Sequence, residues 1–150
     1  MASSASLYNN WKLNVARAVD LSTPATLKLT LHTSSYVPNA ATQAVYADLT
    51  NELATGFGYT NGGLTLSSVG WNLAGTIATL SAANGQWTAS GGNIPAFRYG
   101  VLRVSGTFNT LVDPLMFWVL GDTTPADIPA TTSGNSLTFA WSGSGLFNIS

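Results

Sequence analysis

Hydrophobic and polar residues alternate with a period of two over much of the chain from residue 26 onward. In residues 26–33, Leu27, Leu29 and Leu31 alternate with Lys28, Thr30 and His32. This alternation predicts a strand with one apolar and one polar face. Residues 115–120 are apolar on both faces, so we expect them in a central or covered strand.

Further short strands are separated by Gly, Asn and Pro. We expect them at 64–73 and 76–82 (a hairpin turning at Ala74-Gly75), around Trp87 after a turn at Asn84-Gly85, at 94–104 with an interruption at Gly100, and at 136–141 and 145–149 (a C-terminal hairpin). Residues 43–49 fit a short helix or an irregular strand, and residues 56–63 fit a bulge and a tight turn. About eight strands at intervals of about 8–12 residues predict an all-β antiparallel sandwich or barrel.

One segment near the N-terminus has a helical period instead. Hydrophobic residues recur at every fourth position, at Leu7, Trp11, Val15 and Val19. This spacing predicts a helix over residues 7–19, with Ser6 as its N-cap. Because the apolar stripe is narrow, we expect the helix to lie on a sheet edge or to contact a neighbour.

The amino-acid composition shows that few residues of the chain are charged. Charged residues make up 7 % of its 150 residues, against about a quarter in ordinary soluble domains, and the net charge is −1. At 15.6 kDa we expect a single domain over residues 1–150. The scattered basic residues do not favour nucleic-acid binding, and no apolar run is long enough for a membrane helix. A surface so poor in charge is better explained if other subunits cover part of it, which favours a homo-oligomer.

Candidate catalytic and metal-binding chemistry is sparse. His32 is the one histidine and there is no cysteine; a polar-face strand residue is the favoured interpretation of His32. Paired carboxylates for glycoside hydrolysis would come from Asp48 with Glu52, or from Asp113, Asp122 and Asp127, where turn and capping roles are commoner. Calcium ligation around Asp122 and Asp127 lacks the usual ligand spacing. We therefore expect no enzyme activity, no cofactor and no metal.

The tryptophans leave one alternative open. Trp71, Trp87, Trp118 and Trp141 fall in expected strands, and exposed aromatic rings on a sheet can stack on sugars. Packing in the core or at an interface is the commoner role of a strand tryptophan. A carbohydrate-binding module thus remains an alternative of another class.

Several segments carry a family resemblance. They are Leu7-Tyr8-Asn9-Asn10-Trp11-Lys12, the strand from Thr26 to Pro38 with its Ser-Ser-Tyr-Val-Pro end, Gly56-Phe57-Gly58-Tyr59-Thr60-Asn61-Gly62-Gly63, Phe97-Arg98-Tyr99-Gly100-Val101-Leu102, Pro114-Leu115, Phe139-Ala140-Trp141 and Gly145-Leu146. In these the chain resembles small virion structural proteins of tailed bacteriophages, which look like head decoration or cement proteins.

The resemblance implies a β-sandwich, with a jelly roll as one form of it, bound on the outer surface of a capsid. It implies a virion location after synthesis in the bacterial cytoplasm, with the major capsid protein or other virion proteins as partners. A tail, connector or baseplate component is the alternative within the same particle. The residues we expect at interfaces are Leu7, Trp11, Val15, Tyr59, Asp122 and Asp127.

Overall fold

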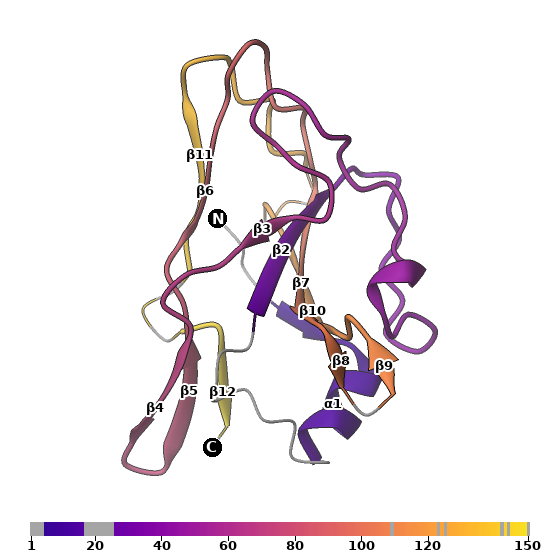
Figure 1. Ribbon diagram of the computed structural model, residues 1–150, viewed down its shortest axis with the longest axis vertical. Coiled ribbons are helices and arrows are strands. Elements are labelled where there is room, and N and C mark those ends of the chain that lie inside the picture. Colours follow the sequence, from indigo (N-terminus) through magenta and orange to yellow (C-terminus); the bar gives the residue numbers. More distant parts are fainter. Residues whose placement is uncertain are drawn as a thin grey trace.

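A computed structural model describes residues 5–16, 26–108, 110–122, 124, 126–141, 143 and 145–149. The regular secondary structure in these residues is mostly antiparallel β-sheet, with one short α-helix near the N-terminus (Figure 1). In chain order the elements are β1 (Ala5–Leu7), α1 (Asn9–Ala16), β2 (Thr26–His32), the 3-10 helix η1 (Tyr46–Asp48), β3 (Leu64–Thr65), β4 (Gly70–Ala74), β5 (Ile77–Ser81), β6 (Gly85–Thr88), β7 (Tyr99–Ser105), β8 (Thr107–Phe108), β9 (Leu111–Val112), β10 (Leu115–Leu120), β11 (Ser136–Phe139) and β12 (Phe147–Ile149).

The strands form two layers. The first layer is one sheet with the order β1-β10-β7-β2-β3. The second layer consists of two smaller sheets, β11-β6 and β12-β5-β4, which lie one above the other along one side of the molecule in Figure 1. The chain passes from β5 into β6 within this layer, and β8 pairs with β9 in a separate small hairpin. The predicted all-β antiparallel sandwich with one N-terminal helix is confirmed.

The core lies between the two layers, where glycines allow close approach. A Cβ atom on Gly100 of β7 would lie 2.9 Å from the ring of Phe139 of β11. A Cβ on Gly85 of β6 would lie 3.2 Å from Leu29 of β2. Side chains from opposite layers therefore fill the space that these glycines leave open.

The other face of the first layer is covered as well. Tyr8, just before α1, packs edge-on against Trp118 of β10, with 4.8 Å between ring centroids. The loop after β2 brings Tyr36 within 5.6 Å of the Tyr99 ring and within 4.7 Å of the His32 ring. Because β2 is covered on both sides, Leu27, Leu29, Leu31, Thr30 and His32 are all buried. His32 lies on the same face of β2 as Thr30, as the alternation predicts, but this face is covered and the side chain is buried.

The N-terminal helix begins two residues later than predicted and is preceded by a strand. Residues 5–7 pair with β10, with Leu7 opposite Phe117, so Ser6 is not an N-cap. The helix begins at Asn9, and the Tyr8 carbonyl accepts the backbone N–H groups of Trp11 and Lys12. Residues 17–19 of the predicted helix lie outside the described residues.

Several predicted pairings differ from those observed. Residues 64–73 are split between β3 in the first layer and β4 in the second, and the hairpin turns at Gly75 and Thr76. Asn84-Gly85 leads into β6 without reversing the chain within the second layer.

The two C-terminal strands do not form a hairpin with each other, because β11 pairs with β6 and β12 pairs with β5. Residues 56–63 form two successive turns rather than a bulge and a turn.

Candidate functional site

His32 is the centre of a buried hydrogen-bonded group at the end of β2. Its Nδ1 lies 2.8 Å from the Thr50 carbonyl oxygen, and its Nε2 lies 2.9 Å from the Thr30 hydroxyl. A carbonyl oxygen can only accept, so Nδ1 carries the proton. Burial lowers the pKa of His32, although the Thr50 carbonyl and the nearby Glu52 oppose this shift. The neutral ring therefore joins β2 to the loop at residues 50–52.

Glu52 accepts three hydrogen bonds from groups around it. Its Oε2 accepts the Tyr46 hydroxyl at 2.6 Å, and its Oε1 accepts the Tyr59 hydroxyl and the Gly62 N–H, both at 2.7 Å. Burial and the bond to Glu52 raise the pKa of Tyr46 to about 12. The pKa of Tyr59 is also raised, mainly by burial. Both phenols are therefore neutral donors at physiological pH.

Arg103 of β7 is the buried cation beside this cluster. Its Nη1 lies 3.0 Å from Asp113 Oδ2, its Nη2 donates to the Gly62 carbonyl at 3.0 Å, and its Cζ lies 4.2 Å from the centre of the Tyr46 ring. The guanidinium side chain is 4 % exposed. Such a paired and stacked arginine ties loops to the sheet and leaves little surface for a ligand.

The glycine-tyrosine segment that contributed to the resemblance belongs to the same cluster. The Tyr59 hydroxyl accepts the backbone N–H of Leu31 while it donates to Glu52. At Gly63 φ is +83°, and a Cβ atom there would lie 2.5 Å from the Leu29 carbonyl oxygen. Only glycine fits such a close approach with this backbone conformation. The segment therefore has a structural role in holding the loop against β2.

These contacts account for the candidate catalytic residues. His32 and Glu52 are each engaged with neighbours that hold loops to the first layer, and Asp113 pairs with Arg103. Asp48 accepts the N–H groups of Ala44 and Val45 at the start of η1. In the described ranges, no group of three or more His, Asp and Glu side chains could hold a metal ion.

The predicted interface residues have different environments. Trp11 and Tyr59 are buried, with 0 % and 1 % exposure. The prediction that these two residues make contacts at the surface is therefore wrong. Leu7 is partly buried in β1, and Val15 lies in α1 with its side chain outside what is described. Asp122 accepts the N–H and hydroxyl of Thr124.

Asp127 lies in the segment that connects β10 to β11. Its carboxylate pairs with Arg98 at 2.8 Å. Isolated bridges join Ile128 to Phe97 and Thr131 to Ile94, so the described part of this loop is held against the segment that precedes β7.

Charge is distributed very unevenly between the two layers. No charged residue occurs in residues 53–97 or 128–150. These two ranges contain every strand of the second layer, β4, β5, β6, β11 and β12. The charged residues described by the structure lie in α1, in the first layer or in loops, and three of them, Arg98, Asp122 and Asp127, lie in the loops that connect the two layers. The second layer is therefore built without a charged side chain.

The outer face of the second layer is neutral and polar in one part. Cross-strand neighbours on β6 and β11 are hydroxyl and amide side chains, with Gln86 Nε2 donating to Thr138 Oγ1 at 3.4 Å and Thr88 Oγ1 3.3 Å from Ser136 Oγ. Their neighbours Trp87 and Phe139 point into the core and are buried. This face can form hydrogen bonds to a partner whose surface carries no complementary charge.

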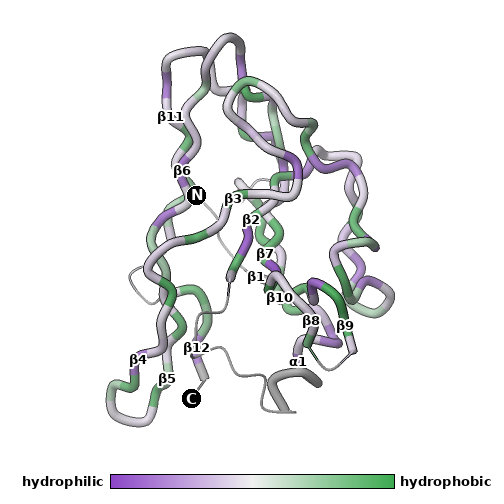
Figure 2. The backbone as a smooth tube through the Cα atoms, in the orientation of Figure 1, coloured by the Kyte–Doolittle hydropathy of each residue, from purple (hydrophilic) through white to green (hydrophobic). Residues whose placement is uncertain are grey.

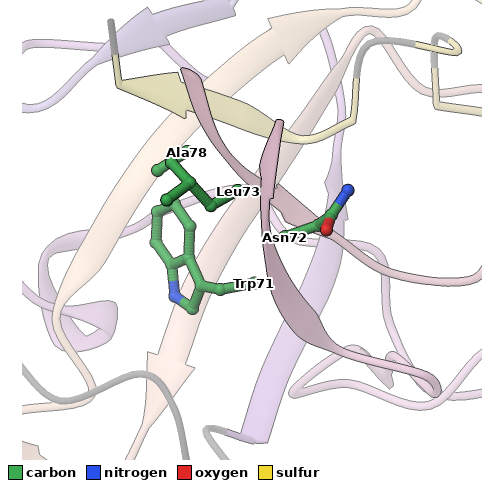
Figure 3. A pocket seen from close by; sticks show the side chains of 4 residues that line it. All are labelled: Trp71, Asn72, Leu73 and Ala78. Atoms are coloured by element: carbon green, nitrogen blue, oxygen red, sulfur yellow. The ribbon is translucent and has the colours of Figure 1, made fainter. Parts of the chain in front are cut away.

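The β4–β5 hairpin is the apolar part of the same layer. Figure 2 shows hydrophobic residues continuing toward its tip, where Leu73 is 70 % exposed and Ile77 is 42 % exposed. Trp71, Asn72, Leu73 and Ala78 line a shallow hollow of about 390 Å³, and the Asn72 side chain points away from the other three (Figure 3). We regard the second layer, with this hairpin, as the candidate interaction surface.

The comparisons with known proteins give no relative. No family model, no curated protein and no solved structure matches this chain. Within the described residues, no helix has the length and apolarity needed to cross a membrane.

Sequence reasoning missed the uncharged layer, although a signal for it was available. The signal is the presence of two long charge-free ranges, 53–97 and 128–150, which a low total of charged residues alone does not reveal. Their significance appears only when the fold places both ranges in one layer.

Proposed function

We propose that this protein is a non-enzymatic structural component of a tailed-phage virion, and that it acts as a decoration or cement protein on the capsid. A cement protein stabilises a shell by binding across subunit boundaries, because each bound copy favours the assembled state by mass action. The proposal combines the family resemblance of the sequence with the chemistry of the surface.

The observation that carries the proposal is the uncharged second layer. Its strands offer Gln86, Thr88, Ser136 and Thr138 on one part of the surface and an apolar hairpin on another. A soluble monomer ordinarily keeps charged residues on all its exposed faces, whereas a face covered by neighbours does not need them. The use of His32, Glu52 and Arg103 inside the fold also favours a structural role over a catalytic one.

The direct experiment mixes purified protein with capsids that lack it and images the particles. We expect added density at regular positions on the outer surface. Capsids that remain bare at saturating protein would contradict the proposal. Copy number separates the alternatives within the virion, because a decoration protein covers the whole shell whereas a tail, connector or baseplate component occupies one vertex or the tail.

A pair of lysine substitutions tests which surface binds. Thr138 lies on the outer face of β11 in the second layer, and Thr107 lies in β8; both are exposed. We expect T138K to weaken capsid binding strongly, because it places a charge in an uncharged contact, and T107K to bind like the wild type. Equal binding by both variants would remove the second layer as the contact surface.

The carbohydrate-binding alternative rests on tryptophan exposure. Trp11 and Trp87 are buried, and Trp71, Trp118 and Trp141 are partly buried against the core. Trp71 shares its hollow with Asn72, Leu73 and Ala78, and the one polar side chain among them, that of Asn72, points to the other side of the strand (Figure 3). A glycan array with specific hits that W71A abolishes would favour this alternative over the virion role.

A further inference from the structure

Strand β4 is the end strand of the β12-β5-β4 sheet, and within the described chain no strand lies along its outer edge. Ala74 and Ile77 are opposite residues on either side of a two-residue turn. Opposite residues in this position exchange both of their backbone hydrogen bonds. Alternation along the strand then directs the backbone N–H and C=O groups of Trp71 and Leu73 to the outer edge.

This edge has none of the features that usually prevent strand pairing. Exposed edge strands are commonly protected by a lysine, a proline, a bulge or an inward-pointing charge. β4 reads Gly-Trp-Asn-Leu-Ala, and its pairing with β5 is regular. The nearest charged residues in the sequence are Glu52 and Arg98. The edge is therefore chemically suited to accept another strand.

The side chains on this edge also favour the addition of another strand along β4. Trp71 and Leu73 lie on one face of β4 and form the hollow with Ala78 of β5 (Figure 3). Leu73 is among the most exposed large hydrophobic residues of the described chain. A strand added along β4 would complete the backbone hydrogen bonding of Trp71 and Leu73 and would also cover their side chains.

We propose that the occupant of this edge is β4 of a second copy of the chain, paired antiparallel across a two-fold axis at Asn72. In this register Trp71 lies opposite Leu73 of the second copy, and Leu73 lies opposite Trp71 of the second copy. Each such pair exchanges two backbone hydrogen bonds, so about four form in total. The contact is self-complementary because it pairs indole with leucine and brings no like charges together.

The dimer goes beyond the proposed function, because it can form whether or not the protein binds a capsid. The joined sheet has the strand order β12-β5-β4-β4-β5-β12. Its outer face presents uncharged residues from both copies, including Asn72 and Thr79. The dimer therefore doubles the area of uncharged surface without introducing a charge.

The first test measures oligomeric state by sedimentation velocity at high micromolar concentration. We expect a dimer for the wild type. L73P removes an N–H that points to the outer edge and leaves the β4–β5 hydrogen bonds intact, so two symmetry-related bonds are lost and the dimer dissociation constant should rise roughly 30-fold. L73K should act in the same direction by charge repulsion. I77K is the matched control on the same hairpin and should remain dimeric.

The second test measures register and does not require a destabilising change. Because the chain has no cysteine, N72C provides a single thiol. In the proposed register the two Asn72 residues form a non-hydrogen-bonded pair with Cα atoms about 4.5 Å apart, within the range of a disulfide. We expect N72C to form a disulfide-linked dimer under mild oxidation, and T79C on the neighbouring strand to form far less.

Each result bears on the dimer separately from capsid binding. A monomeric or trimeric wild type, an L73P variant as dimeric as the wild type, or equal cross-linking of N72C and T79C would overturn the β4 contact. If the protein is monomeric alone but L73P abolishes capsid binding, the edge accepts a strand of a virion protein instead, which also overturns the second copy as occupant. A dimer that does not bind capsids would contradict the proposed function and leave the dimer standing.

Discussion

The two layers of this sandwich use polar chemistry in opposite ways. In the first layer and its loops, charged and titratable groups such as Arg103, Glu52 and His32 are drawn inside and hold the loops in place. In the second layer the polar side chains are neutral and face outward, as Gln86 and Thr138 do. The polar groups of the first layer thus hold its loops in place, and the contrast supports our proposal that the second layer serves as a surface for partners.

The largest expected effect comes from removing the buried cation of the first layer. R103M leaves Asp113 and the Gly62 carbonyl without their partner, and breaking such a buried pair costs about 3–5 kcal/mol. The matched control is R98M, which breaks the more exposed pair with Asp127 and should cost under about 1 kcal/mol. Urea unfolding of both variants gives the comparison. Equal losses would contradict an internal role of Arg103.

A smaller effect is expected where the layers meet. G100A places a methyl group against the Phe139 ring, and such overpacking costs about 1–3 kcal/mol. G143A is the control, since nothing lies within 4 Å of a Cβ atom at Gly143. Thermal unfolding should separate the two variants. If G100A is as stable as G143A, Phe139 does not pack on the first layer as described.

His32 makes the free energy of unfolding depend on pH. The pKa of His32 is lowered in the folded chain from 6.5, so below pH 6.5 the unfolded chain binds a proton that the folded chain does not. The contribution of His32 to the free energy of unfolding has its full value above pH 6.5. It decreases by about 1.4 kcal/mol per pH unit as the pH falls toward the pKa of His32 in the folded chain. H32Q should lose this slope in urea titrations between pH 7 and 5. An unchanged slope would show that another group is responsible.

The smallest effect on stability is expected in the second layer. T138K lies on an exposed outer face, so its free energy of unfolding should stay within about 0.5 kcal/mol of the wild type. The same variant is expected to weaken capsid binding strongly. Loss of stability in place of loss of binding would remove the distinction between the two layers.

The hydrophobic pattern within a single segment was sufficient to predict β2 and the covered position of β10. β2 followed from alternating leucines, and the covered position of β10 followed from its apolar run, since each signal lies within a single segment. β1 was missed because three residues at the start of a helix-like pattern carry too little periodicity. The pairing of β11 with β6 was missed because alternation does not specify a distant partner.

The candidate site was harder to predict because it depends on which segments meet. Tyr59 and Trp11 are aromatic residues suited to an interface by type, yet the fold buries both. His32 is buried because the loop at Thr50 and Tyr36 covers it, which its own strand pattern does not encode. The uncharged surface was visible in the sequence only as two separate ranges.

The most direct test of the central claim is an electron cryo-microscopy reconstruction of the phage particle that resolves the orientation of this protein. We expect many copies on the capsid, with β6 and β11 facing neighbouring subunits and the loops around Arg98 and Asp127 facing solvent. A reconstruction in which the second layer faces solvent, while the charged loops form the contact with the capsid, would contradict the claim.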